Sequence, residues 1–170
     1  MARDITAPVR ADLNASASPN ILLAFLTIDH ASLPEPIRVV CDPIDFMVGS
    51  DLYVGCPFEF KLLNDDEAPP TTQIRVQNVD RRIGNTLLSI TGRASLALEV
   101  RSSADFDLSV VPRMPTVPVP TVLYGFRFFS LIDVTGTPLD ITGTLMLRDY
   151  TQEPWPSRRA TQARCPGLFR

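Results

Sequence analysis

Residues that build metal sites and disulfide frameworks are scarce in this 170-residue sequence. It contains three cysteines, an odd number without a CxxC spacing, and a single histidine, His30. A tetrahedral zinc site or a disulfide framework needs more of these residues at recognisable spacings. We therefore expect no metal, no cofactor and free thiols, as in a protein made in a reducing cytoplasm. Cys41 and Cys56 lie in apolar, strand-like runs, which predicts that both are small buried core residues.

Long hydrophobic runs and an excess of positive charge are also missing. The first twenty residues have no apolar core of the length that a signal peptide needs, and no later stretch approaches the roughly 18 to 20 apolar residues of a membrane span. The formal net charge is −3, and apart from Lys61 all the basic residues are arginines. Export, membrane insertion and general binding to nucleic acid are therefore disfavoured.

No motif of a known catalytic site is present. The glycines follow no phosphate-binding pattern, and no serine sits in a nucleophile elbow. The acidic run Asp65, Asp66 and Glu67 lacks the alternating spacing and the glycine of a calcium loop, which favours a solvated loop. His30 follows a predicted helix, where a histidine commonly caps the helix or joins an interface. We predict a non-enzymatic protein; a hydrolase would require His30 and a carboxylate to converge in one pocket.

The length suits one globular domain with a protruding tail. Residues 1–17 are small and polar without periodicity, which indicates a flexible leader. Ser18 as N-cap and Pro19 at the first helical position, followed by apolar residues at helical spacing, predict a helix of about three turns that ends before Pro34. The main domain is then 18–150, followed by a C-terminal arm.

After this predicted helix the apolar pattern changes towards period two, which indicates strands. The fold class that we predict is mainly β, an antiparallel sandwich or barrel-like domain with one or two short helices. Gly55 and Pro57 in the second strand segment predict a break near residues 55–57, and the last two segments are expected to form a closing hairpin. The predicted strand segments are 37–41, 51–63, 72–79, 94–102, 106–111, 122–136 and 138–150.

Three connecting segments have other characters. The acidic stretch NDDEAPP (64–70) is expected to be a loop that joins antiparallel neighbours. Residues 80–90 place Ile83, Leu87 and Ile90 on one face, which predicts a short helix. The stretch 113–121 alternates proline with valine and threonine, and because proline donates no backbone hydrogen bond it predicts a linker or a sheet edge.

The arm, residues 151–170, combines apolar side chains with arginines but has no helical or strand period. Trp155, Leu168 and Phe169 cannot be buried by such a segment alone, so it folds back onto its domain or docks on another molecule. Arg158 and Arg159 belong to a basic stretch that would contact RNA only weakly. Pairing with acidic loops of a neighbouring copy fits the negative net charge better.

Three sequence blocks together resemble a known family. They are PIRVVCDPIDF (36–46), PFEFKLLNDDEAPPTTQIRVQNVDRRI (57–83) and DYTQEPWPSRRATQARCPGLF (149–169). In order and spacing they are similar to a family of phage proteins catalogued only as a domain of unknown function and encoded among the tail-tip genes of long-tailed phages. The resemblance covers most of residues 18–170.

The resemblance implies a minor or distal tail protein of the virion, assembled in the cytoplasm of the host bacterium. Such proteins are generally β-sandwich or barrel-like domains in hexameric rings that join the tail tube to the tip or baseplate. The implied partners are further copies of this chain, the tail tube and the tail hub or tip proteins. Aromatic residues and arginine are enriched at interface hot spots. The predicted interface residues are Arg81, Arg82, Trp155, Arg158, Arg159, Leu168 and Phe169.

An alternative role is a carbohydrate-binding or host-receptor-binding module of the tail. Sandwich domains often present aromatic side chains to sugars, and Tyr53, Tyr124 and Trp155 are available for this.

Overall fold

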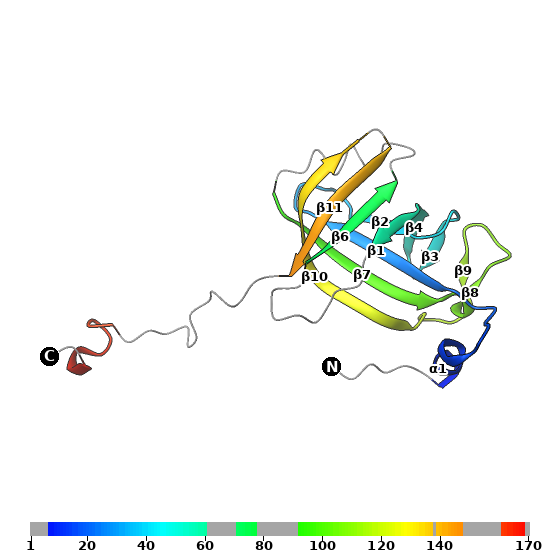
Figure 1. Cartoon of the computed structure of the whole chain (residues 1–170), viewed down its shortest axis with the longest axis horizontal. Coiled ribbons are helices and arrows are strands. Elements are labelled where there is room, and N and C mark those ends of the chain that lie inside the picture. Colours follow the sequence, from blue (N-terminus) through cyan, green and yellow to red (C-terminus); the bar gives the residue numbers. More distant parts are fainter. Residues whose placement is uncertain (1–6, 61–70, 78–91, 138, 148–160, 169–170) are drawn as a thin grey trace.

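The computed structural model describes residues 7–60, 71–77, 92–137, 139–147 and 161–168 (Figure 1). The predicted acidic loop and the predicted helix at 80–90 lie outside the described residues. The elements are α1 (Ala7–Asn14), β1 (Leu22–Asp29), β2 (Ile37–Val40), β3 (Phe46–Val48), β4 (Asp51–Gly55), β5 (Phe58–Phe60), β6 (Thr71–Gln77), β7 (Ala94–Ser102), the 3₁₀ turn η1 (Ser103–Asp105), β8 (Phe106–Asp107), β9 (Met114–Pro115), β10 (Val122–Gly136), β11 (Asp140–Leu147) and the 3₁₀ turn η2 (Pro166–Leu168).

The predicted helix after Ser18 is wrong, because this stretch forms strand β1. Its apolar run is buried on both faces, so the side chains show no alternation. A short continuous apolar run fits a buried helix and a doubly covered strand equally well by periodicity. β1 pairs on one edge with β2 and on the other with β7, and these two ladders decide in favour of the strand.

Within the predicted leader the structure contains a helix, α1, that the sequence pattern did not indicate. The Asn20 side-chain amide donates to the Asp12 carboxylate at 2.7 Å, which ties this helix to the start of β1. Such a contact between residues eight positions apart leaves no trace in local periodicity.

Among the described residues, nine strands form one sheet in the order β3-β4-β2-β1-β7-β10-β11-β6-β5. Every neighbouring pair is antiparallel except β2 and β4, which are parallel, so the sheet is mixed. The predicted strands at 37–41, 51–63, 72–79 and 94–102 are confirmed over their described residues, with the expected break between β4 and β5. The mainly β fold class is therefore confirmed, as one large sheet with, among the described residues, one short α-helix.

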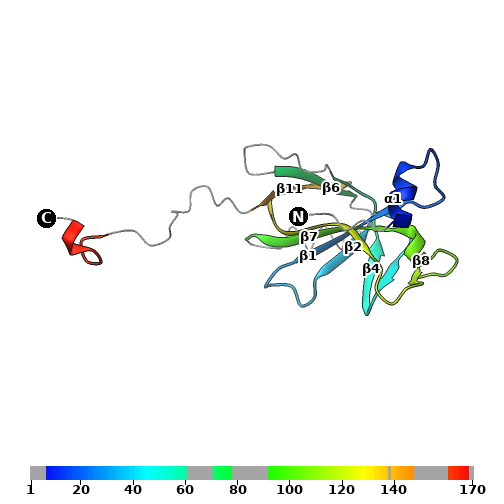
Figure 2. The ribbon, with the colours of Figure 1, turned by 90° about the horizontal axis from the view of Figure 1, so that it is seen from below.

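The two ends of the strand order lie close together. β4 and β5 stand near opposite ends, yet only Cys56 and Pro57 separate them in the chain. The Cys56 N–H donates to the Val40 carbonyl at 2.9 Å, and the Pro57 carbonyl accepts the Gln77 N–H at 3.2 Å. The sheet consequently bends back on itself without closing as a barrel over the described residues (Figures 1 and 2).

The main core lies on the inner face of this bent sheet and contains aliphatic residues at alternating strand positions. Gly143 on β11 lets the core close, because a Cβ there would lie 2.6 Å from Leu131 Cδ1. Burial of such side chains stabilises the fold by about 25 cal/mol per Å² of apolar surface. The core residues are Ala24, Leu26, Ile28, Val39, Cys56, Phe58, Ile74, Val76, Ala94, Leu96, Leu98, Phe129, Leu131, Ile141 and Leu145.

A second core covers the other face of β1. It is aromatic, with the Phe25 ring at 5.7 Å from the Phe46 ring, 5.1 Å from the Tyr53 ring and 5.7 Å from the Phe106 ring. Edge-to-face and stacked pairs of this kind add about 0.5–1.5 kcal/mol each beyond area burial. Through Phe106 this core reaches the connection between β7 and β10.

The predicted closing hairpin is confirmed by the antiparallel pairing of β10 with β11. β10 is fifteen residues long, and it pairs with β7 along its first part and with β11 along its second part. The register shifts between Phe126 and Phe129 and again between Ile132 and Thr135. Such bulges increase the local twist, which suits a strand that crosses from one side of a bent sheet to the other.

Candidate interaction surface

Of the seven predicted interface residues, only Leu168 belongs to the described part of the chain. It ends η2 and is 72% exposed. The other six lie outside the described residues: Arg81, Arg82, Trp155, Arg158, Arg159 and Phe169.

The connection between β7 and β10 supplies a surface that the sequence reasoning did not select. Of the predicted strand at 106–111, only Phe106 and Asp107 are strand, which corrects that prediction. The Asp107 carboxylate accepts the Ser109 N–H at 2.9 Å and the Ser109 hydroxyl at 2.6 Å. This local turn competes with strand extension. The chain returns through β9, which pairs with β8 and places the predicted edge segment at the rim of the sheet, where proline is tolerated.

Arg113 fixes one side of this connection. Its guanidinium pairs with the Asp42 carboxylate at 3.0 Å, and both side chains are largely buried. The guanidinium also lies 5.1 Å from the centre of the Phe46 ring, a cation–π contact. The Arg113 N–H donates to the Asp45 carbonyl and its carbonyl accepts the Met47 N–H, each at 2.8 Å. The segment thereby covers the outer edge of β3.

Arg101 and Asp105 fix the other side. The buried Arg101 guanidinium donates to the Pro120 carbonyl, pairs with Glu99 at 2.7 Å and lies 5.9 Å from the Phe25 ring centre. The Asp105 carboxylate accepts the Thr121 N–H at 2.8 Å. Charge-assisted hydrogen bonds of this kind are stronger than neutral ones. The segment is thus anchored at both sides by charged groups that face inward.

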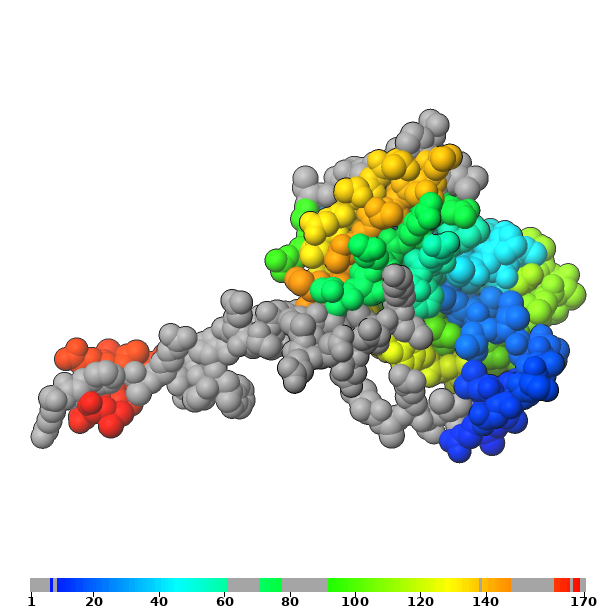
Figure 3. Space-filling model, viewed as in Figure 1, coloured from blue at the N-terminus to red at the C-terminus, as the bar shows by residue number. Residues whose placement is uncertain are grey.

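Apart from Ser109 and Thr116, the exposed side chains of the anchored segment are apolar. Arg113 is the one charged residue between positions 108 and 122, and its charge is used internally. Val111 and Val119 are 77% and 79% exposed. In Figure 3 the segment forms the yellow-green margin of the molecule. We call its exposed apolar residues the valine surface: Leu108, Val110, Val111, Met114, Val117, Val119 and Val122.

A carboxylate stands beside the valine surface. The hydrogen bonds from Ser109, first from its hydroxyl and then from its N–H, lower the pKa of Asp107 below its ordinary value. The charged form is therefore favoured. Among the ion pairs of the described residues, none involves Asp107. The surface accordingly offers apolar contact together with one anion.

Of the side chains considered for catalysis or sugar binding, His30, Tyr53 and Tyr124 are described, whereas Trp155 lies outside the described residues. His30 follows a strand rather than a helix, and its Nδ1 lies 2.7 Å from the Ser32 hydroxyl oxygen and accepts the Ser32 N–H. Tyr53 is buried, with its hydroxyl 3.2 Å from that of Thr27, so its ring faces the second core. Tyr124 packs edge-on against Phe126 at 4.2 Å.

The two cysteines of the strand runs differ. Cys56 is buried as predicted, whereas Cys41 is exposed, which corrects the prediction of a core residue. Cys41 follows β2 at the point where the chain leaves the sheet, and its thiol donates to the Phe58 carbonyl at 3.2 Å. Within the described ranges no three His, Cys, Asp or Glu side chains gather as metal ligands. No described helix has the length and hydropathy to cross a membrane.

A sequence signal for the valine surface does exist. Residues 114–122 read MPTVPVPTV, an uncharged stretch in which valine and proline alternate. Proline keeps such a stretch out of the sheet interior, so its apolar residues have no ready partner within the fold. The prediction of a linker or a sheet edge did not include this consequence.

Comparison with protein-family models gives a match over most of the chain. A family model described as "Domain of unknown function (DUF1833)" matches residues 8–160, which include the sheet, the anchored segment and the start of the arm. No curated protein matches the sequence significantly. Because the family model spans most of the chain, the protein belongs to the DUF1833 family.

Proposed function

We propose that this protein is a structural, non-enzymatic subunit of a bacteriophage tail tip, a minor or distal tail protein. Copies of the chain assemble as a ring, expected to be hexameric, that joins the tail tube to the tip or baseplate. The phage role rests on the resemblance of the three sequence blocks to a family encoded among tail-tip genes.

The single observation that carries the assembly role is the valine surface. An apolar surface exposed to water is costly unless a partner covers it, and on monomeric proteins such patches commonly mark interaction sites. Here the exposed valines stand on a backbone that buried ion pairs hold in place. A surface ordered in advance loses little conformational entropy on binding, which favours a stable contact between subunits.

The sugar-binding and receptor-binding role has less support. It relies on exposed aromatic rings, and the Tyr53 ring is packed against Phe25 within the second core. A glycan array or an adsorption-blocking assay with a clear signal would favour that role over the structural one.

The structural proposal is tested by measuring mass and location. Light scattering of the purified protein should give a discrete multiple of the 18.8 kDa chain, with about six copies expected for the ring. Electron microscopy of phage particles should show density for the protein around the tail axis. A chain that stays monomeric at high concentration and is absent from particles would contradict the proposal.

A further inference from the structure

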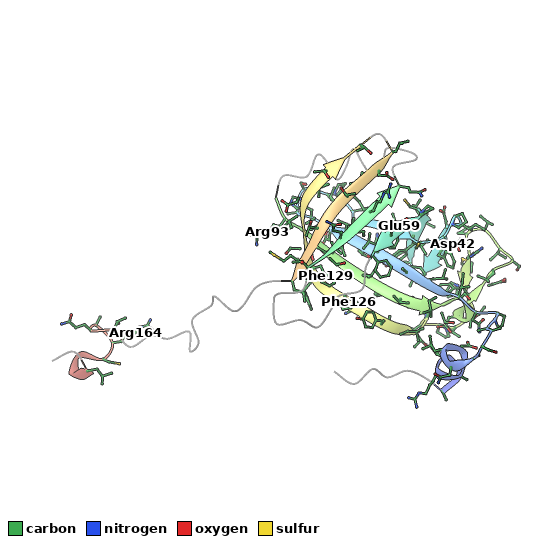
Figure 4. All side chains as sticks on the ribbon, in the orientation of Figure 1. Asp42, Glu59, Arg93, Phe126, Phe129 and Arg164 are labelled. Carbon is green, nitrogen blue, oxygen red and sulfur yellow. The ribbon has the colours of Figure 1, made fainter. Side chains whose placement is uncertain are left out.

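The C-terminal segment Thr161–Leu168 has a defined local shape and no cover. The N–H groups of Arg164 and Cys165 donate to the Thr161 carbonyl at 2.9 and 2.8 Å, and the Leu168 N–H donates to the Cys165 carbonyl at 3.0 Å. These turns leave Leu168 exposed. Arg164 lies on this segment (Figure 4) and has no ion pair among the described residues.

The valine surface matches this segment in chemistry. One offers exposed apolar side chains next to the Asp107 carboxylate, and the other offers Leu168 and Arg164. The match extends to net charge. Residues 151–170 carry four arginines and one glutamate, so they contribute +3 and the preceding 150 residues contribute −6. Attraction between the two parts is therefore favourable at neutral pH.

Chain length allows the segment to reach another molecule. Thirteen residues, 148–160, connect the end of β11 to Thr161. At roughly 3.3–3.6 Å per residue they span up to about 45 Å, which exceeds the radius of a domain of this size. The segment can therefore reach a neighbouring copy of the chain.

We infer that residues 161–168 of one copy dock on the valine surface of the next copy, with Leu168 among the exposed valines and Arg164 beside Asp107. This inference rests on the proposed assembly of the chain and names the contact that builds it. Because two different surfaces meet, the contact is head-to-tail, and repeated contacts of this kind close into a ring when the rotation between copies allows it.

Cross-linking between two distinguishable copies tests this contact. One copy is tagged and carries Val119→Cys, Cys41→Ser and Cys165→Ser; the other is untagged, carries Cys41→Ser and keeps Cys165, three residues before Leu168. The two are mixed at a concentration at which the wild type associates, and are treated with a mild thiol oxidant. We expect a disulfide-linked dimer that contains one copy of each kind.

A matched control replaces Val119→Cys with Leu139→Cys in the tagged copy. Leu139 is 77% exposed, nearly as much as Val119, but it lies outside the valine surface, before β11. We expect at least a fivefold lower yield of the mixed dimer from this control. Equal yields would overturn the inference. A chain with both Val119→Cys and Cys165 that cross-links only within itself would also overturn it, by placing the segment on its own domain.

A second variant separates this inference from the proposed function. Leu168→Asp puts a charge where an apolar contact is expected, and it should raise the concentration needed for association at least tenfold, whereas Leu139→Asp should not. If the wild type forms the oligomer and Leu168→Asp leaves it unchanged, the docking contact is wrong and the structural role stands. If the wild type does not associate and is absent from particles, the structural role itself fails.

Discussion

Two apolar stretches of this chain have opposite fates. From Leu23 to Ile28, strand β1 buries nearly all its side chains on two faces, whereas residues 108–122 expose most of theirs. β1 can donate and accept backbone hydrogen bonds along both edges, and β2 and β7 use them. The later stretch contains four prolines and is held at the rim by inward-facing charges. Burial thus depends on available backbone donors as well as on hydrophobicity.

The two stretches should differ most in how much free energy of unfolding is lost when a side chain is truncated to alanine. Leu26 on β1 is fully buried, so Leu26→Ala removes apolar contacts and leaves a cavity. It should lower the free energy of unfolding by about 3 kcal/mol. Val119→Ala, on the exposed stretch, should change it by less than about 0.5 kcal/mol. Urea unfolding of both variants measures this contrast, and similar losses would show that the valine surface is part of the folded core.

The anchoring of the exposed stretch can be broken at Arg113. Arg113→Met leaves the largely buried Asp42 carboxylate without its cation, which should cost about 2–3 kcal/mol of unfolding free energy. This loss of unfolding free energy is smaller than for a fully buried pair. The buried Arg113 Nε has no hydrogen-bond partner in the structure, and the substitution removes this unsatisfied donor. Limited proteolysis should then cut within 108–121 more readily.

The control for Arg113 is Arg38, whose ion pair with Asp51 is considerably more exposed. Arg38→Met should cost no more than about 1 kcal/mol and leave the proteolysis pattern unchanged. If both substitutions have the same effect, the Arg113 pair does not anchor the segment.

A smaller loss of unfolding free energy is expected at Gly55, whose backbone lies against Pro43 and against Asp42, the ion-pair partner of Arg113. A Cβ on Gly55 would lie 2.7 Å from the Pro43 carbonyl carbon and 2.8 Å from the Asp42 oxygen, and backbone cannot move aside easily. Gly55→Ala should therefore cost about 2 kcal/mol. At Gly143 the new Cβ would meet the end of the Leu131 side chain, which can adjust, so Gly143→Ala should cost about half as much. Thermal unfolding should rank the two variants in this order.

The smallest effect concerns the charge beside the valine surface. Ser109→Ala removes the hydroxyl donor, so the pKa of Asp107 should rise towards its ordinary value while the remaining N–H keeps it somewhat lower. In the wild type the lowered folded pKa favours the folded state above the unfolded pKa, and this contribution is lost as pH falls through the folded pKa. NMR titration of the carboxyl carbon measures the change; an unaltered pKa would show that the hydroxyl does not bond to Asp107.

Strand positions were predictable where one face is buried and the other is not. β6, β7 and β11 alternate in burial, and period two is visible in their residues. β1 was not predictable in this way, because burial on both faces erases the alternation. Leu168 was predicted as an interface residue from its apolar character in an aperiodic arm; it is exposed, and its interface role stays a prediction. The valine surface was missed because the proline-rich stretch was interpreted as a linker or a sheet edge, without asking what covers its apolar side chains.

The sequence by itself determined the mainly β class, the break at Cys56 and Pro57, the closing hairpin and the uncharged character of the stretch before β10. These follow from alternation, proline placement and the distribution of charge, which are local properties of the chain. Only the tertiary structure decided that β1 is a strand, that Cys41 is exposed, and that Arg101 and Arg113 turn inward. Those outcomes depend on partners tens of residues away, as the pairing of Arg113 with Asp42 shows.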